Sequence, residues 1–407
     1  MTFDPRAAEQ QGYLVVPGLI DLHAHLREPG HEDSETIDTG TKAALRGGFT
    51  TVCAMPNTEP ALDAPGLIRE LLARRYGTKR ANVKLIGAIT RGRKGRELAD
   101  LVELAEAGAV AFSDDGAPVD DAALFRHALE YARTRGLLIV EHPEDRTLSA
   151  NGVMHEGTVS AALGLPGIPA AAEESAVARD LALAKLTGAR LHLTHLSTAG
   201  AIDLVRRAKA DGVAVTCDVT PHHLSLTDEW VAGSRTLAWE REAAPRGVPY
   251  DSSTKVNPPL RTLADVRALW RALADGTVDA IATDHAPHAS VRKDVEFDQA
   301  AFGISALETA VPLVLGGARA GWAPEERVID ALTEGPARVL GIRLPTHDWT
   351  VIDRDLEWRV TADELASKGK NTPLLGRILT GRVVATAMEG EVRYGRDARV
   401  AETIGAR

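Results

Sequence analysis

The sequence predicts a (β/α)8 barrel of the TIM type, an α/β fold in which eight parallel strands alternate with helices. Short runs of apolar and β-branched residues recur along the 407-residue chain, and amphipathic stretches separate most of them. Strands that are apolar almost throughout are typical of a parallel sheet that helices cover on both faces. There are eight such runs, which is the number that closes a barrel.

These patterns place the predicted strands and several of the helices between them. We expect strands at Leu19–His25, Phe49–Met55, Val83–Ile89, Ala109–Ser113, Leu137–His142, Arg190–His195, Val213–Val219 and Val278–Thr283. We expect helices at Thr36–Arg46, Pro65–Arg75, Arg96–Ala107 and Asp120–Arg135. The alternative, an open doubly wound sheet, is disfavoured because no glycine-rich phosphate turn follows the first strand.

The pattern changes towards the C-terminus. Trp349–Ile352, Leu356–Val360 and Val383–Tyr394 read as strands rather than helices, so we expect a small β-domain beside the barrel. We assign residues 17–343 to the barrel and residues 344–407 to this small β-domain.

Composition and charge exclude several classes of protein. The formal charge of −10 gives no electrostatic support for a nucleic-acid or anionic-membrane partner. The one basic cluster, Arg91, Arg93, Lys94 and Arg96, lies in a glycine-rich stretch and reads as a solvated loop. Cys53 and Cys217 each lie in an apolar run, which indicates buried thiols in a reducing compartment. With no signal peptide and no apolar stretch of ~20 residues, we expect a cytoplasmic protein.

The first chemical signal lies on the first predicted strand. Side chains two apart on a strand face the same side, so Asp21, His23 and His25 project together. In a barrel strand this side is the interior, and the C-terminal ends of the strands open into the active site. Two imidazoles there can bind a divalent metal, although a pair of buried core histidines is the alternative.

More candidate metal ligands fall at the ends of other predicted strands. Asp114 and Asp115 follow the fourth strand, and His142 ends the fifth. His195 ends the sixth strand, and Asp284 follows the eighth. Four histidines and two carboxylates would therefore meet at one rim of the barrel. Such a set suits Zn²⁺ best, with Mn²⁺ and Co²⁺ as less favoured alternatives.

Several motifs in this sequence resemble those of one enzyme family. They are Pro17–Gly30, Met55–Thr58, Ser113–Gly116, Lys255–Arg261 and Ala282–His288. In this order they resemble the type I, bacterial-type dihydroorotases of the amidohydrolase superfamily. The resemblance extends from about Pro17 to the C-terminus.

The resemblance implies a set of metal ligands. His23, His25 and Asp284 would hold one Zn²⁺, His142 and His195 a second, and Asp115 would bridge them. Many members of the superfamily bridge with a carboxylated lysine, but this loop offers only aspartates, as in the bacterial type I branch. We select Asp115 over Asp114 because its spacing to His142 matches the family. One or two zinc ions per chain are expected.

The resemblance also implies the reaction and the substrate contacts. The enzyme would reversibly cyclise N-carbamoyl-L-aspartate to L-dihydroorotate in pyrimidine biosynthesis, with a metal-bound hydroxide as nucleophile and Asp284 as general acid and base. Arg27, Asn57 and His288 would hold the substrate carboxylate. Asn257 would contact the ureido or ring edge, and Gly303 would add backbone contacts. The alternatives are a salt bridge of Arg27 to Glu28 or Glu35 and a loop histidine without a ligand at position 288.

The other histidines have plainer readings. His192 would point away from His195 on the same strand and belong to the core. His222 and His223 follow the seventh strand and favour supporting or structural roles. Surface or turn positions are expected for His31, His127, His155 and His347.

The N-terminal end departs from the type I pattern. Type I enzymes usually begin with several strands that pair with the C-terminal strands in a small β-sandwich, and residues 1–16 would be a remnant of them. We therefore expect an incomplete sandwich with exposed apolar strand faces, unless the chain begins upstream or another subunit covers the gap.

Four further expectations concern partners and competing functions. The chain would form a homodimer and could associate with aspartate transcarbamoylase. One alternative is another cyclic amidohydrolase, namely a hydantoinase, dihydropyrimidinase or allantoinase. The other is a non-catalytic, dihydroorotase-like partner of aspartate transcarbamoylase, although degenerate copies typically lose ligands that this sequence retains.

Overall fold

The computed structural model describes residues 2–74, 80–396 and 400. Its main element is an eight-stranded parallel sheet in the order β2-β3-β4-β5-β6-β9-β10-β11. The strands are β2 (Leu19–Ala24), β3 (Phe49–Ala54), β4 (Asn82–Gly87), β5 (Ala109–Phe112), β6 (Leu138–Glu141), β9 (Arg190–Leu193), β10 (Val215–Val219) and β11 (Ala280–Ile281). All eight predicted strands are confirmed.

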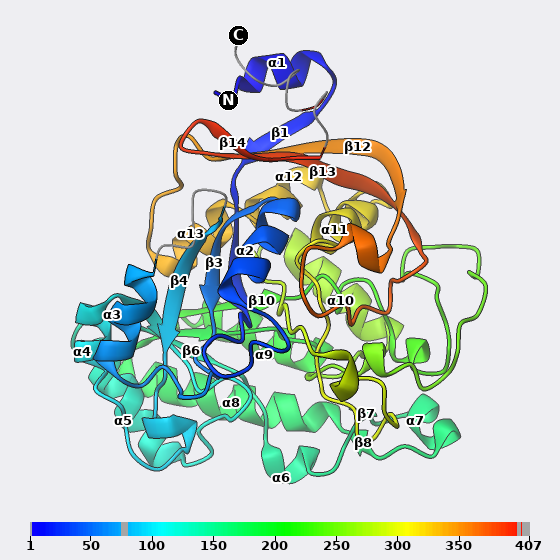
Figure 1. Cartoon of the computed structure of the whole chain (residues 1–407). Helices are drawn as coiled ribbons and strands as arrows, with labels where there is room; N and C mark the ends of the chain where they lie inside the picture. The colour runs from blue at the N-terminus through cyan, green and yellow to red at the C-terminus, as the bar shows by residue number, and fades with distance from the viewer. Residues whose placement is uncertain (1, 75–79, 397–399, 401–407) are drawn as a thin grey trace.

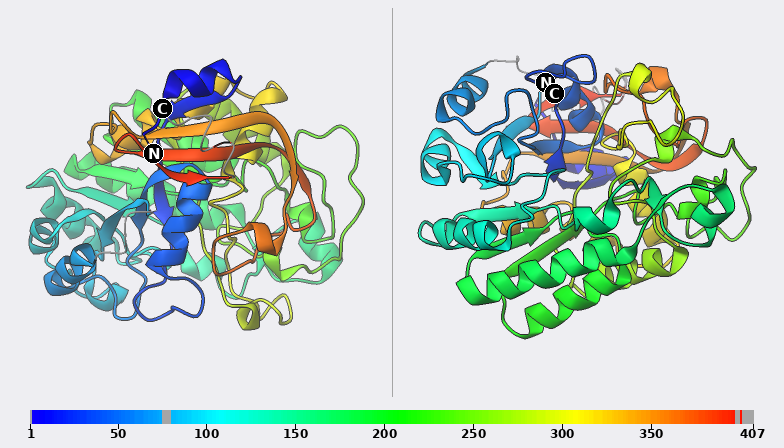
Figure 2. Two further views of the ribbon diagram at one scale, coloured as in Figure 1. Left: turned by 45° about the horizontal axis from the view of Figure 1, so that its top comes forward. Right: turned by 90° about the horizontal axis from the view of Figure 1, so that it is seen from below.

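The sheet closes into a barrel between its first and last strands. Ala24 and His285 form a parallel bridge, and the His25 backbone N–H donates to the His285 carbonyl at 2.8 Å. Helices pack around the outside of the strands, as Figures 1 and 2 show. The predicted (β/α)8 barrel is therefore confirmed.

The helices follow the strands in the expected order. Those along the barrel are α2 (Ile37–Arg46), α3 (Pro65–Ala73), α4 (Leu101–Ala107), α5 (Ala122–Arg133), α8 (Ala170–Thr187), α9 (Ala199–Ala210), α10 (Leu263–Ala274), α11 (Ala310–Arg319), α12 (Glu325–Asp330) and α13 (Glu334–Leu340). The connections hold the shorter elements α6 (Arg146–Ser149), β7 (Met154–His155), α7 (Thr158–Leu163), β8 (Gly167–Ile168), η1 (Arg91–Arg93), η2 (Asp228–Trp230), η3 (Ser252–Thr254), η4 (Ser290–Arg292) and η5 (Ala362–Glu364).

Helix α4 differs from the prediction at its start. The helix was expected from Arg96, but Asp100 caps it by accepting a hydrogen bond from the Glu103 N–H at 3.0 Å. Upstream of this cap, Leu98 pairs with Thr90 in an antiparallel bridge, which keeps Leu98 out of the helix. A capping aspartate thus sets the boundary that periodicity alone misplaced. Arg75, the last residue of the helix predicted at Pro65–Arg75, lies outside the described residues.

A second sheet lies against the barrel. It has four antiparallel strands in the order β1-β12-β13-β14. They are β1 (Leu14–Pro17), β12 (Trp349–Arg359), β13 (Ile378–Met388) and β14 (Glu391–Gly395). N-terminal and C-terminal strands thus share one small sheet, as expected. The division of the chain at residues 16/17 and 343/344 stays a prediction.

One predicted strand of this sheet is a hairpin. Val383–Tyr394 was expected as a single strand, but β13 and β14 turn back on each other between Met388 and Glu391. Glu389 and Gly390 both adopt positive φ angles, 53° and 75°, which is the geometry of a tight two-residue hairpin turn.

The small sheet packs between the barrel and α1 (Pro5–Gln10). On the barrel side, the Thr350 hydroxyl donates to the Gly48 carbonyl at 2.6 Å. On the other side, Phe3 and Ala8 join a buried apolar cluster with strand residues that include Val351 and Val384. Figure 1 shows α1 above this sheet and the barrel below it. The expectation of an exposed apolar face is therefore wrong where α1 covers the sheet.

Within the described part of the chain, no helix combines the length and the apolar character needed to cross a bilayer.

Candidate metal centre

Six polar side chains meet at the C-terminal end of the barrel. His25 directly follows β2, on which His23 lies, and His142 directly follows β6. Asp115, His195 and Asp284 stand two or three residues beyond β5, β9 and β11. All six side chains are buried, although charged residues seldom are without a partner or a metal.

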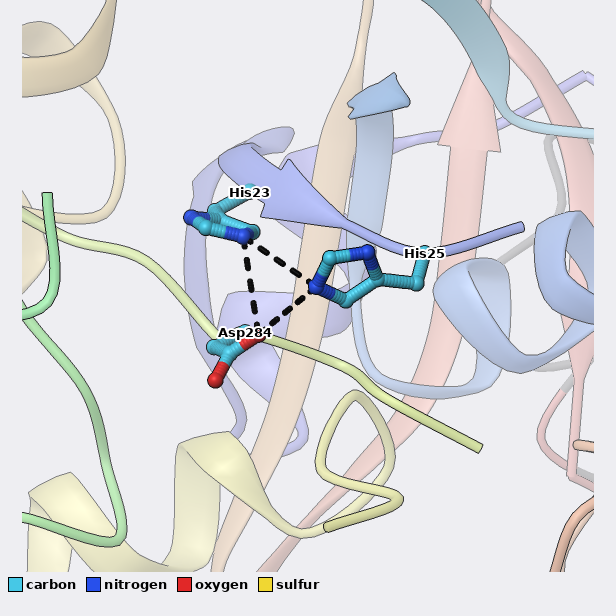
Figure 3. A group of neighbouring side chains, drawn as sticks. All are labelled: His23, His25 and Asp284. Atoms are coloured by element: carbon cyan, nitrogen blue, oxygen red, sulfur yellow. Dashed lines mark hydrogen bonds and ion pairs between the residues drawn. The ribbon is translucent and has the colours of Figure 1, made fainter. Parts of the chain in front are cut away.

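Three of these side chains form one tight group, which Figure 3 shows. The Nε2 atoms of His23 and His25 lie 3.2 Å apart. Asp284 Oδ1 lies 3.0 Å from His25 Nε2 and 3.5 Å from His23 Nε2. Three ligand atoms this close, from two imidazoles and one carboxylate, face a common point.

Asp115 joins this group to the other two histidines. Its Oδ1 atom lies 3.5 Å from each of His23 Nε2, His142 Nδ1 and His195 Nε2. His142 Nδ1 and His195 Nε2 are themselves 2.9 Å apart. Among the described residues, Asp115 Oδ1 is buried without a hydrogen-bond partner. The structure thus brings all six predicted ligands together and places Asp115 between the two histidine pairs.

Hydrogen bonds at the Nδ1 atoms of His23 and His25 set the tautomers of these two rings. His25 Nδ1 lies 2.9 Å from the side-chain Oδ1 of Asn57, so His25 Nδ1 must donate. His23 Nδ1 lies 2.9 Å from Thr194 Oγ1, and that hydroxyl donates in turn to Asp218. In the neutral form of each ring, Nε2 is therefore the lone-pair nitrogen, and the two Nε2 atoms face each other. Facing lone pairs repel unless a cation lies between them, so these residues fit a divalent metal.

The electrostatics of the cluster also favour a cation. Burial opposes a charge on His23, but Asp115 and Asp284 outweigh it and raise the pKa of His23 to about 9. Burial opposes a charge on His142 too, yet Asp115 and Glu144 raise its pKa to about 10. Despite its burial, Asp115 has a pKa well below the usual range because these histidines surround it. The carboxylates thus favour positive charge at this point, whether a proton or a metal ion supplies it.

Two of the six residues have an unusual backbone. His195 and Asp284 adopt φ angles of 43° and 44°, in the left-handed region that non-glycine residues rarely enter. Buried carboxylates hold both segments: Asp218 accepts the His195 N–H at 2.7 Å, and Asp21 accepts the Thr283 N–H at 2.8 Å. Such strain persists only where the surroundings enforce it, and it concentrates at functional sites.

A cavity of about 200 Å³ opens above the cluster. Its walls include five of the six candidate ligands, all except His23. They also include every residue predicted to contact substrate: Arg27, Asn57, Asn257, His288 and Gly303. Residues from distant parts of the sequence therefore share one cavity with the cluster.

Arg27 lies half-buried in the cavity wall without an acidic partner among the described residues. Its Nε donates to the Pro287 carbonyl at 3.1 Å. Glu28 instead pairs with Arg74 at 2.8 Å, and Glu35 with His285 at 3.3 Å, so the alternative salt bridges of Arg27 do not form. Burial lowers the pKa of Arg27 to about 10, which leaves it charged at neutral pH and ready to bind an anion.

Comparison with known proteins identifies the family. The profile of the family described as "Dihydro-orotase-like" matches residues 12–201. The chain is 54% identical to a protein of Pelotomaculum thermopropionicum named dihydroorotase, over 94% of this chain and 88% of that protein. A protein of the same name from Anaeromyxobacter dehalogenans strain 2CP-1 is 50% identical, over 97% and 89% of the two chains. The chain belongs to the dihydroorotase family.

Solved structures with the same architecture are more distant in sequence. The L-hydantoinase (dihydropyrimidinase) of Arthrobacter aurescens has a TM-score of 0.79 at 24% identity, over 94% of this chain and 85% of that chain. A dihydropyrimidinase from Brevibacillus agri NCHU1002 has a TM-score of 0.73 at 22% identity, with the same coverage. At this identity they show only that the dihydroorotase-family chain shares their fold.

Besides His285, four of the remaining histidines of this dihydroorotase-family chain are buried outside the cluster. His192 is a buried core residue, as predicted, and lies 2.8 Å from both Thr216 Oγ1 and Asp218 Oδ2. His223 donates to the Pro258 carbonyl at 2.9 Å, and His222 is buried with no hydrogen-bond partner among the described residues. The surface or turn assignment of His155 is wrong, because this histidine is buried against the guanidinium of Arg261.

Sequence reasoning missed three residues that support the centre, namely Asp218, Arg93 and Glu144. Arg93 was expected in a solvated loop, but its guanidinium donates to the Asp115 carbonyl and holds that loop in place. Glu144 contacts His142 Nε2 at 3.1 Å. The spacing of Glu144, two residues after a candidate ligand, was the only local signal; for Arg93 the sequence holds none.

Proposed function

We propose that this protein is a dihydroorotase, which interconverts N-carbamoyl-L-aspartate and L-dihydroorotate with the help of zinc. The observation that carries the proposal is the shared cavity, which holds both the histidine and aspartate cluster and Arg27, a residue with no acidic partner in the described part of the chain. The cluster suits hydrolysis or closure of an amide bond. The guanidinium suits a substrate that carries a carboxylate next to that bond.

The six clustered residues would hold the metal. His23, His25 and Asp284 would bind one Zn²⁺, and His142 and His195 a second, with Asp115 shared between them. Nitrogen and carboxylate donors are the ligands that zinc takes at catalytic sites. A divalent metal bound there supplies a lowered pKa for a coordinated water and polarises the amide carbonyl. Asp114 does not join them, because its carboxylate accepts the Ile89 and Thr90 N–H groups instead.

Asp284 would move the proton of the reaction. Its carboxylate lies at the cavity wall, and neighbouring histidines, His25 foremost, keep its pKa below the usual range despite burial. In the hydrolytic direction it would accept a proton from the attacking water and deliver it to the leaving ring nitrogen. In the synthetic direction it would take that proton from the ureido nitrogen and give it to the departing water.

Three residues that line the same cavity would hold the substrate carboxylate. Arg27 supplies the positive charge. Asn57 uses its carbonyl oxygen for His25, which leaves its amino group to donate to the substrate. Burial and the nearby Arg27 lower the pKa of His288 to about 3, so this histidine is neutral. Its one N–H, on Nε2, donates to the Phe302 carbonyl at 2.7 Å, so His288 would exchange this hydrogen bond to donate to the carboxylate.

One assay on one purified sample tests the proposal. Zinc content is measured together with the loss of ultraviolet absorbance of dihydroorotate, hydantoin and allantoin. We expect bound zinc and turnover of dihydroorotate far above that of the two rings without a carboxylate. Preference for hydantoin or allantoin would make the protein another cyclic amidohydrolase. Absence of both zinc and turnover would make it a non-catalytic relative.

Assembly forms a separate part of the proposal. We infer a cytoplasmic homodimer that works in pyrimidine biosynthesis and can associate with aspartate transcarbamoylase. Size-exclusion chromatography with light scattering, alone and with that enzyme from the same source, tests both statements. A monomer, or two separate peaks for the mixture, would contradict them.

A further inference from the structure

Glu144 contacts both halves of the proposed site through a single oxygen atom. It lies in the loop after β6, two residues beyond His142. Its Oε2 is 3.1 Å from His142 Nε2 and 3.2 Å from Asn257 Nδ2. One carboxylate oxygen thus touches a candidate metal ligand and a candidate substrate residue that are far apart in the sequence.

The first contact sets the tautomer of His142. An ionised carboxylate only accepts hydrogen bonds, so His142 Nε2 must carry the hydrogen. In the neutral ring Nδ1 then presents the lone pair, 3.5 Å from Asp115 Oδ1 and 2.9 Å from His195 Nε2. A carboxylate behind a histidine in this way orients the ring and strengthens it as a ligand.

The second contact sets the orientation of the Asn257 amide. Its amino group donates to Glu144, because the opposite orientation would place Oδ1 against the carboxylate. Asn257 lines the same cavity as Arg27 and Asp284. With its amino group engaged, Asn257 has its carbonyl oxygen left as an acceptor, which suits an N–H group of a ligand.

We propose that Glu144 is a positioning residue that couples the metal centre to substrate selection. Through one oxygen it fixes His142 as an Nδ1 ligand and fixes Asn257 as an acceptor for a ureido or ring N–H. The coupling to substrate rests on the proposed function, whereas the coupling to metal does not. Glu144 lies in none of the sequence motifs described above, so these motifs indicate neither role.

A zinc competition tests the metal half. The chelator-stripped protein, its Glu144→Ala and Glu144→Gln variants and a control variant, Glu130→Gln, are titrated with zinc against a chromophoric chelator. Glu130 is exposed, and its one ion pair among residues 2–74, 80–396 and 400 is with Arg126 on the same helix, so it controls for the loss of a carboxylate. We expect Glu144→Ala to weaken zinc binding about 10–100-fold, the usual effect of removing such a partner. The Gln variant keeps an acceptor oxygen and should lie much closer to wild type.

A double-mutant cycle tests the substrate half. The KM for dihydroorotate is measured at saturating zinc for wild type, Glu144→Ala, Asn257→Ala and the double variant. We expect Glu144→Ala to raise KM in the wild-type background and to change it little once Asn257 is Ala. Equal effects in both backgrounds would overturn the link between the two residues. Thermal unfolding of each variant, and recovery by Glu144→Gln, separate this coupling from a general loss of folding.

The two proposals fail in different ways. A wild-type protein that never turns over dihydroorotate would contradict the proposed function. The zinc competition would still test the link from Glu144 to His142. A wild-type enzyme that is active, with a Glu144→Ala variant equal to it in zinc affinity and in KM, sinks the role of Glu144 alone.

Discussion

The carboxylate of Asp218 accepts the backbone N–H of His195 at 2.7 Å. His195 needs this partner because its φ angle of 43° is left-handed and costly for a residue with a side chain. The same carboxylate also takes the Nε2–H of His192 at 2.8 Å and the hydroxyl of Thr194 at 3.1 Å. Asp218 therefore holds the end of one strand in the conformation that turns His195 into the cluster.

Asp218→Ala should weaken both the fold and the metal centre. It leaves the buried His195 N–H and His192 Nε2 without their acceptor, and each such orphaned group costs ~1–3 kcal/mol. Urea unfolding should show a loss of that size together with weaker zinc binding. Asp203→Ala, at an exposed helix position, is the control and should change neither quantity. A stable Asp218→Ala protein with normal zinc affinity would contradict this account of the strained turn.

Asp284→Asn should nearly abolish turnover while the protein stays folded. Removal of a general acid and base typically costs ~10²–10⁴-fold in rate. The variant keeps the shape of the side chain, so the melting temperature should hold and kcat should fall by at least two orders of magnitude. Zinc content measured on the same sample shows how much of the loss comes from metal. Activity close to that of wild type would remove Asp284 from the mechanism.

Arg27→Gln should act on substrate binding more than on chemistry. A hydrogen bond to a charged group contributes ~1.5–3 kcal/mol, which corresponds to a rise in KM of ~10–100-fold. Arg27→Lys should recover only part of this, because an ammonium cannot form the two parallel bonds of a guanidinium. Arg91→Gln, at an exposed position paired with Glu97, is the control. An unchanged KM for dihydroorotate in Arg27→Gln would remove the carboxylate contact.

The stability of the metal-free protein should fall as pH rises from about 6.5 to about 10. His23 and His142 have pKa values of about 9 and about 10 in the folded chain, against an ordinary value of 6.5. A raised pKa means that folding binds protons, so their stabilisation is complete below pH 6.5 and is lost as pH rises through the folded values. Thermal melts of chelator-treated protein across this range check the slope.

Zinc-loaded protein is the control for the pH series. Metal and proton compete for the same histidine nitrogens, so zinc should release protons on binding and should bind less tightly as pH falls below about 9. The pH slope seen without metal should then disappear. An identical slope with and without zinc would show that other groups cause it.

The sequence by itself determined the architecture and the candidate ligands. Alternation of apolar strands with amphipathic helices predicts the barrel, because strands covered on both faces must be apolar throughout. Strand geometry also places His23 and His25 on the same side of one strand. It places His142 and Asp284 at the ends of two other strands, on the same rim of the barrel. Each of these signals is local, so one amino-acid sequence is enough to reveal it.

Only the tertiary structure decided what surrounds the cluster. Asp218, Glu144 and Arg93 act through contacts with residues on other strands or loops, and spacing along the chain cannot reveal such contacts. The burial of His155 against Arg261 depends on how two long connections pack, so its sequence context read as a turn. Ligand identity is encoded by local strand register, whereas tautomers, strain and unpaired charge arise when distant segments meet in a low-dielectric interior.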